Sequence, residues 1–213
     1  MEIVFDAASS RAHSLDVNTV TWNHTVGTGG NRILVVGLAL EDSSLSDLVV
    51  NSVTYNGVAM SHVPGSDNTV TGYVKTDLWY LLNPPTGTYQ VLVTFAGKVR
   101  SKICGSVSLS NVAQQAPAAV AVNSVTTYET SISTDINVPT ASSWVVDVVA
   151  GSSGAGSFTE TAAEMSLRWT QITDYSSGAS STKESSSGAT TLSYTNTANG
   201  RMSHSLAAFA PAE

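Results

Sequence analysis

The stretch Thr76–Phe95 (TDLWYLLNPPTGTYQVLVTF) decides the fold class. It holds two strand-like runs, Asp77–Leu82 and Thr88–Phe95, joined by Asn83-Pro84-Pro85-Thr86-Gly87. Two prolines followed by a glycine cannot continue a helix or a central strand, so the chain must turn there. The second run alternates with period two, as a strand with two different faces does. The stretch predicts two antiparallel strands, Val70–Leu82 and Thr88–Phe95, that pair with each other, and it contains no catalytic or cofactor motif.

Outward from this stretch, turn signals divide the chain into about a dozen predicted strands. Ile33–Leu40 and Trp144–Ala150 (WVVDVVA) are nearly continuous apolar runs. Such runs predict strands buried on both faces, and we expect them at the centres of two sheets. Asn56-Gly57 stands between the predicted strands Leu48–Tyr55 and Val58–Val63. It predicts a tight hairpin, because both turn residues must take positive φ.

The second half of the chain is also predicted to consist of short strands divided by turn signals. Val120–Tyr128 and Ser131–Val138 are predicted to form a hairpin around Glu129-Thr130. The Ser- and Gly-rich stretch between Ser176 and Gly188 is predicted to be a long surface loop. Gln114–Ala119 is interpreted as a crossing between sheets rather than a linker. The whole chain, residues 1–213, is therefore predicted to be one all-β domain: a single antiparallel β-sandwich with jelly-roll-like connectivity.

Charge argues against a nucleic-acid partner. The net charge is −7, and only 12% of the residues are charged, about half the usual share of roughly 25%. Binding to a phosphate backbone needs clustered lysine and arginine, and the densest cluster here is Lys98, Arg100 and Lys102. Spaced by two, these cations are interpreted as a polar strand face or a guarded sheet edge. Nucleic acid is therefore excluded as a main partner.

No targeting or membrane segment is expected. The segment Met1–Asp6 lacks the basic and apolar regions of a signal peptide. The longest apolar run, Ile33–Leu40, is far shorter than the roughly 18 residues that a membrane helix needs. We therefore expect a protein that is made in the cytoplasm without export and has no membrane partner.

Residues able to carry chemistry are scattered. His13, His24, His62 and His204 form no metal-binding spacing, so they are interpreted as surface or capping residues. Glu41, Asp42 and Asp47 follow a buried run and can be weighed as a calcium site, but the serines between them favour an ordinary solvated loop. Cys104, the one cysteine, is interpreted as a small buried apolar residue. No catalytic, cofactor-binding or metal-binding residue is predicted.

The four tryptophans divide by their neighbours. Trp79 and Trp144 lie in apolar runs and are predicted to be core residues. Trp22 and Trp169 lie among polar neighbours and are the candidates for an exposed, sugar-stacking platform. The single glycosylation sequon, Asn23-His24-Thr25, matters only in a secreted protein.

A set of turn and core motifs resembles a widespread β-sandwich module. The motifs are Asn31–Gly37 (NRILVVG), Val53–Met60 (VTYNGVAM), Leu78–Gly87 (LWYLLNPPTG), Gly105–Val112 (GSVSLSNV), Trp144–Ala150 and Ser205–Phe209 (SLAAF). The module is found in bacterial surface proteins and in structural proteins of tailed phages, and the similarity spans roughly residues 20–210, the length of one domain. The resemblance implies the fold and no catalytic residue.

The resemblance and the composition together suggest a function. A bacterial surface protein is expected to have a signal peptide and tandem copies, neither of which is present here. The chain is therefore predicted to be a non-enzymatic phage virion protein, a capsid decoration (cement) protein on the outer head surface. Its expected partners are the major capsid protein or another virion protein and further copies of itself, in a homotrimer. The alternatives are a tail or fibre component of the virion, a carbohydrate-binding or adhesion module, and a hydrolase, which would need two convergent carboxylates or a positioned nucleophile.

Overall fold

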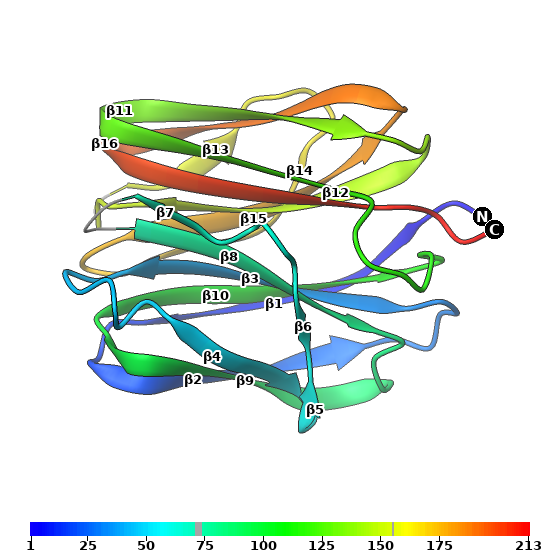
Figure 1. The fold of residues 1–213 in the computed structure, drawn as a ribbon, viewed down its shortest axis with the longest axis horizontal. Coiled ribbons are helices and arrows are strands. Elements are labelled where there is room, and N and C mark those ends of the chain that lie inside the picture. Colours follow the sequence, from blue (N-terminus) through cyan, green and yellow to red (C-terminus); the bar gives the residue numbers. More distant parts are fainter. Residues whose placement is uncertain (71–73, 155) are drawn as a thin grey trace.

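The computed structural model describes residues 1–70, 74–154 and 156–213 (Figure 1). The described residues form sixteen strands and no helix, and every pairing between these strands is antiparallel, so the predicted fold class is confirmed. It follows that no helix in this part of the chain is able to span a membrane.

The strands of the first half are β1 (Val4–His13), β2 (Val17–Val26), β3 (Ile33–Glu41), β4 (Val50–Tyr55), β5 (Val58–Ala59), β6 (Ser61–His62), β7 (Asn68–Val70), β8 (Val74–Leu82), β9 (Gly87–Val99) and β10 (Ser101–Ser110). Those of the second half are β11 (Ala119–Val138), β12 (Ser143–Gly151), β13 (Phe158–Glu160), β14 (Ser166–Ile172), β15 (Ser177–Ser185) and β16 (Gly188–Phe209). The segment 114–119 carries the chain from one sheet to another, as predicted.

The described strands form three stacked sheets, one more than a simple sandwich has (Figure 1). The lower sheet has the order β2-β9-β4-β5. The central sheet has the order β1-β10-β3-β8-β6, with β7 also paired to β8. The upper sheet has the order β11-β16-β12-β15-β14, with β13 paired to β16. The two predicted central strands, β3 and β12, occupy the middle of the central and upper sheets.

The lower and central sheets together have the strand order of a jelly roll. The chain alternates between them, so that β1, β3, β8 and β10 lie in the central sheet and β2, β4, β5 and β9 in the lower one. The resulting orders, β1-β10-β3-β8 and β2-β9-β4-β5, are those of an eight-stranded jelly roll with two Greek keys. The predicted connectivity therefore describes the first half of the chain, and the second half adds a sheet to the outer face of the jelly roll.

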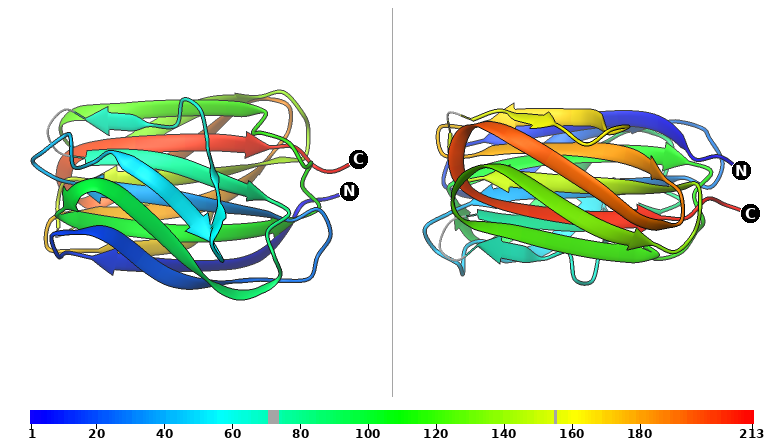
Figure 2. Two further views of the ribbon diagram at one scale, coloured as in Figure 1. Left: turned by 60° about the horizontal axis from the view of Figure 1, so that its bottom comes forward. Right: turned by 90° about the horizontal axis from the view of Figure 1, so that it is seen from above.

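The upper sheet folds back over itself through its two longest strands. Residues 119–125 of β11 pair with 202–208 of β16, and after bulges residues 131–138 pair with 188–195. Figure 2 shows both strands curving across the top of the molecule, β11 in green and β16 from orange to red. We call residues 131–138 and 188–195 the cover, because they lie over the outer face of β12 and share its buried apolar clusters.

Because side chains alternate between the two faces of each strand, they fill three apolar layers. One lies between the lower and central sheets, one between the central and upper sheets, and one between the upper sheet and the cover. From β3, the even-numbered residues from Leu34 to Leu40 face the lower sheet, while Ile33, Val35 and Ala39 face the upper sheet. From β12, Val146 and Val148 face the central sheet, and Val145 and Val149 face the cover. Both strands are thus covered on both faces, which confirms the interpretation of their continuous apolar sequences.

The decisive stretch turns at the predicted residues, but its two strands do not pair. β8 lies in the central sheet and β9 in the lower sheet, so the predicted pairing was wrong. Asn83 (φ 45°) and Gly87 (φ 120°) adopt left-handed conformations in the crossing. Arg32 holds it by donating to Asn83 Oδ1 (2.8 Å) and to the Pro84 carbonyl (3.1 Å). Prolines stop strand extension, but they do not specify whether the chain returns to the same sheet.

Two predictions in the second half were also wrong. No hairpin forms around Glu129-Thr130, because β11 continues through these residues and bends at bulges between Val125 and Ser131. The stretch predicted as a surface loop is largely strand β15, buried between β12 and β14. Its small side chains let the upper and central sheets approach closely: a Cβ placed on Gly178 would lie 2.8 Å from the Cβ of Ala39.

The predicted Asn56-Gly57 hairpin is confirmed. Both residues have positive φ, 50° and 73°, and Tyr55 pairs with Val58 across the turn. The return strand is shorter than predicted, because the chain leaves the lower sheet after Ala59 and joins the central sheet at Ser61.

Candidate functional site

A cavity of about 620 Å³ lies at one end of the upper sheet. We call it the Trp144 cavity. Its walls come from the start of β12, from β14 and from the end of β15, and they combine one aromatic ring, one arginine, two glutamates and several hydroxyls. Its lining residues are Ala141, Ser142, Trp144, Glu164, Ser166, Arg168, Thr182, Glu184, Ser185 and Ser186. Two of them, Ser142 (φ 56°) and Glu164 (φ 64°), have left-handed backbone conformations, which non-glycine residues rarely adopt.

Arg168 is directed toward this cavity by a β-bulge. Leu167 pairs with Ser181 and Trp169 with Ser180, so Arg168 is the extra residue between them. Bulges commonly turn a side chain out of the regular strand pattern beside a functional site. The guanidinium lies 3.8 Å from the centre of the Phe5 ring and 5.8 Å from that of Trp144, and its Nε donates to Thr182 Oγ1 (2.7 Å).

The charge of Arg168 is not neutralised by an ion pair. Of the ion pairs among the described residues, none includes Arg168, although Glu164 and Glu184 line the same cavity. Burial lowers the pKa of the guanidinium below its ordinary value, yet an arginine stays charged in proteins. The cavity therefore contains a half-buried planar cation whose Nη groups form no ion pair among the described residues.

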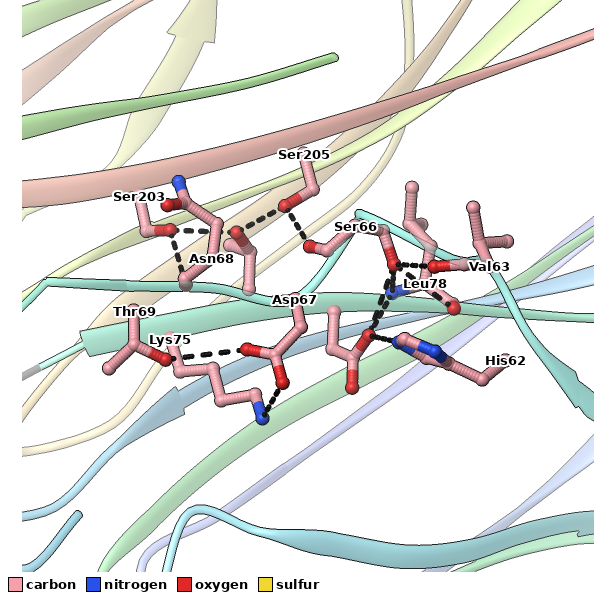
Figure 3. Close-up of polar contacts among 12 residues, drawn as sticks. His62, Val63, Ser66, Asp67, Asn68, Thr69, Lys75, Leu78, Ser203 and Ser205 are labelled. Carbon is pink, nitrogen blue, oxygen red and sulfur yellow. Dashed lines mark hydrogen bonds and ion pairs between the residues drawn. The ribbon is translucent and has the colours of Figure 1, made fainter. Parts of the chain in front are cut away.

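A second candidate is the cluster around His62 and Asp77, beside a cavity of about 310 Å³ (Figure 3). His62 Nε2 lies 2.7 Å from Asp77 Oδ1, and this carboxylate also accepts from Ser66 Oγ (3.1 Å) and Trp79 Nε1 (3.3 Å). The hydrogen bond to Asp77 raises the pKa of His62 against the opposing effect of burial. Lys75 Nζ pairs separately with Asp67 (3.0 Å).

These contacts fasten a crossing segment to two sheets. Ser205 Oγ donates to the Ser66 carbonyl (2.7 Å) and Ser203 Oγ to the Asn68 carbonyl (2.8 Å), so residues 66–68 are tied to β16 (Figure 3). The same segment is tied to β8 through Asp77. No nucleophile is placed against His62 in these contacts, so the geometry supports a structural role for the cluster.

A carboxylate, an imidazole and a hydroxyl stand in series inside the upper sheet. His204 Nε2 lies 3.1 Å from Asp147 Oδ2, and His204 Nδ1 lies 2.9 Å from Thr134 Oγ1. Asp147 also accepts from Tyr194 (3.0 Å) and from Ser181. The order resembles a hydrolytic triad, but Asp147 and His204 are 0% exposed. A substrate cannot reach these groups, so the network is a hydrogen-bonded core that joins the cover to β12 and β15.

Several sequence-based assignments of burial need correction. His24 and His204 are buried rather than at the surface, and desolvation lowers the pKa of His24 to about 4. Trp22 and Trp169, the predicted platform, are only 8% and 6% exposed. Trp79 and Trp144 are instead partly exposed and line cavities. The side of the strand on which each residue falls, and not the polarity of its neighbours, decides its burial.

The acids weighed for calcium are bound by protein groups. Glu41 pairs with Arg100, and Asp42 accepts from the backbone N–H groups of Ser44 (2.8 Å) and Arg100 (2.7 Å). The Asp47 side chain lies over Gly97. Within residues 1–70, 74–154 and 156–213, no three histidine, cysteine or acidic side chains are grouped as metal ligands.

The basic cluster does not form one strand face. Lys98 is exposed, whereas Lys102 is buried and donates to the carbonyls of Leu15 (2.7 Å), Val17 and Val99. Arg100 lies between β9 and β10. Cys104 is a buried free thiol in the core below the central sheet, as predicted, and burial raises its pKa well above the ordinary value.

Comparison with known proteins identifies no family. No family model matches the sequence, and no curated protein is similar to it at a significant level. Three solved structures overlap weakly. That of Cucumber Necrosis Virus has 11% identity and a TM-score of 0.32 over 86% of this chain and 72% of that one. The structure of Sulfolobus Turreted Icosahedral Virus has 11% identity and a TM-score of 0.23 over 99% of this chain and 93% of that one. The structure of Cucumber Leaf Spot Virus has 9% identity and a TM-score of 0.26 over 100% of this chain and 91% of that one. TM-scores this low do not establish a shared fold.

Proposed function

We propose that this chain is a non-catalytic structural protein of a tailed-phage virion, and that it decorates the outer surface of the head as a homotrimer. The observation that carries the proposal is the jelly-roll strand order of β1–β10, an architecture used by viral capsid and lectin domains. Fold alone does not fix function. The resemblance of the turn and core motifs to phage structural modules supports a place in a virion among the uses of this fold.

The absence of enzymatic activity is part of the proposal. The series of groups that most resembles a hydrolytic triad, Asp147, His204 and Thr134, is sealed in the core. The net charge of −7 favours a surface that faces away from packaged DNA, because a surface in contact with the genome favours cations.

A partly open sheet edge supports self-association. Among the described strands β11 is paired with β16 alone and is the outermost strand of its sheet, although Asn68 of β7 donates to the Asn123 carbonyl (2.6 Å). Its 20 residues include no lysine, arginine or proline, which are the residues that commonly protect an edge from pairing with another chain. Val122 on this strand is 42% exposed. We assign the β11 edge as one side of the contact between copies. A homotrimer needs a head-to-tail contact, so the β11 edge of one copy meets a different surface of the next copy, and the ring closes after three copies.

Native mass spectrometry of the purified protein tests this assignment. We expect a mass of three chains that persists at high salt, because edge hydrogen bonds and apolar contacts are screened little. Val122→Lys places a charge on the β11 edge and should give monomers. Val58→Lys, at a similarly exposed valine (46%) in the Asn56-Gly57 hairpin, is the matched control and should leave the trimer intact. A wild-type monomer, or equal behaviour of both variants, would count against the β11 contact.

A further inference from the structure

We propose that the Trp144 cavity is a binding site for a neutral sugar unit of a glycan. The volume of about 620 Å³ lies within the range of roughly 300–1,000 Å³ that is typical of small-molecule sites. This site is independent of the proposed place in a virion, since a sugar can bind to the cavity whether or not the protein is attached to a capsid.

The aromatic wall supplies the apolar contact. Trp144 is half-buried at the start of β12, and part of its side chain lines the cavity. An indole ring offers a flat apolar surface with an electron-rich face. The axial C–H groups on one face of a hexose ring are complementary to such a surface.

Arg168 supplies fixed donors. Its stacking on Phe5 and its bond to Thr182 hold the guanidinium plane in place. The Nη groups have no ion-pair partner among the residues that the structure describes. A planar guanidinium presents parallel donors, which match two adjacent hydroxyl oxygens of a sugar.

The remaining polar groups select against charge on the ligand. The lining has one cation, Arg168, and two carboxylates, Glu164 and Glu184. A ligand with net charge of either sign therefore meets a like charge within the same cavity. A neutral polyol can donate to the carboxylates and accept from the guanidinium, and the serine hydroxyls of the wall can do both.

Titration followed by two-dimensional NMR tests the site in the full-length protein. The probes are neutral trisaccharides of glucose, galactose, mannose and N-acetylglucosamine, with trigalacturonate and chitosan trimer as charged counterparts. We expect at least one neutral probe to saturate with a Kd of about 1 mM or lower. The shifted amide signals should belong to the residues that line the cavity.

Two substitutions and one control identify the contacts. Arg168→Lys keeps the charge and removes the planar fork, and it should weaken binding at least about fivefold. Trp144→Leu keeps an apolar side chain and removes the ring, and it should weaken binding similarly. Arg11→Lys, at an exposed arginine of β1 outside the cavity, should bind as the unsubstituted protein does. Amide spectra without sugar confirm that each variant is folded.

The proposal would be overturned by any of three results. The first is that no neutral probe binds with a Kd of about 1 mM or lower. The second is that binding is unchanged in folded Arg168→Lys. The third is that a charged trimer binds more tightly than every neutral one.

Discussion

At the residue scale, the buried His24 and the half-buried His62 affect stability in opposite directions as the pH changes. His24 is buried and bonded to the hydroxyls of Ser9 (2.8 Å) and Ser108 (3.1 Å), and desolvation lowers its pKa to about 4. The ordinary value near 6.5 applies to the unfolded chain. His62 is half-buried against Asp77, which raises its pKa.

The lowered pKa of His24 predicts a loss of stability in acid. Above pH 6.5 the residue is neutral in both states, so its contribution is fully present. As the pH falls from 6.5 to about 4 the unfolded chain binds the proton first, and about 3 kcal/mol of stability is lost. Urea unfolding at several pH values should show a shallower loss over this window in His24→Gln than in the unsubstituted protein.

His62→Gln is the informative counterpart. Because the pKa of His62 is raised in the folded state, its stabilising contribution is complete below pH 6.5 and disappears as the pH rises through the folded-state pKa. His62→Gln should therefore lose more stability at pH 5.5 than at pH 8.5. If both variants changed the pH profile in the same direction, the assigned environments would be wrong.

Close approach of the upper and central sheets depends on Gly105. A Cβ at this position would lie 2.3 Å from Trp169 Cε2, so Gly105→Ala must displace a buried indole. We expect destabilisation of about 1–3 kcal/mol, measured as a lower urea midpoint. Gly30→Ala is the control, because a Cβ there meets nothing within 4 Å. Equal stability of the two variants would contradict the packing described.

At the scale of elements, the Asn56-Gly57 turn depends on backbone conformation alone. Gly57 has φ +73°, and a Cβ added there would meet no atom within 4 Å. Gly57→Val therefore destabilises the turn by backbone strain and not by a steric clash with neighbouring residues. It should cost about 1 kcal/mol or more. Gly30→Val, in open space without a left-handed φ, is the matched control. An unchanged melting temperature in Gly57→Val would count against the turn.

How far the elements could be predicted depended on the kind of signal. Continuous apolar runs identified β3 and β12, and Asn56-Gly57 identified a hairpin, because these signals are local. β15 was mistaken for a loop, since its serines and glycine are selected by the narrow space between sheets. The pairing of β8 and β9 was wrong because the choice between hairpin and crossing depends on contacts distant in sequence. The Trp144 cavity could not be predicted, because its walls come from strands that are distant in sequence. The one local sign was Arg168, a charged residue next to Trp169. Asp147 stands alone among the apolar residues of Trp144–Ala150 (WVVDVVA). A charged residue in such a run was the one sequence sign of the buried hydrogen-bond network around it.

At the scale of the whole molecule, one apolar layer joins residues of both halves of the chain. Val35 and Ile103 of the central sheet share a buried cluster with Val148 and Phe209 of the upper sheet. We therefore predict that residues 1–213 unfold as one unit. Limited proteolysis should not release two stable halves near Gln114, and the thermal transition should be single. Two independently stable fragments would show that the jelly roll and the upper sheet are separate domains.

We propose that this protein resides on the outer surface of a phage head. The decisive measurement is the structure and composition of a purified particle: mass spectrometry of its proteins and a density map of its head by electron cryomicroscopy. We predict that this chain is present and that three copies form sandwich-shaped density on the outer surface around symmetry axes of the shell. Absence of the chain from purified particles, or its location on the inner surface against the genome, would overturn the proposed function.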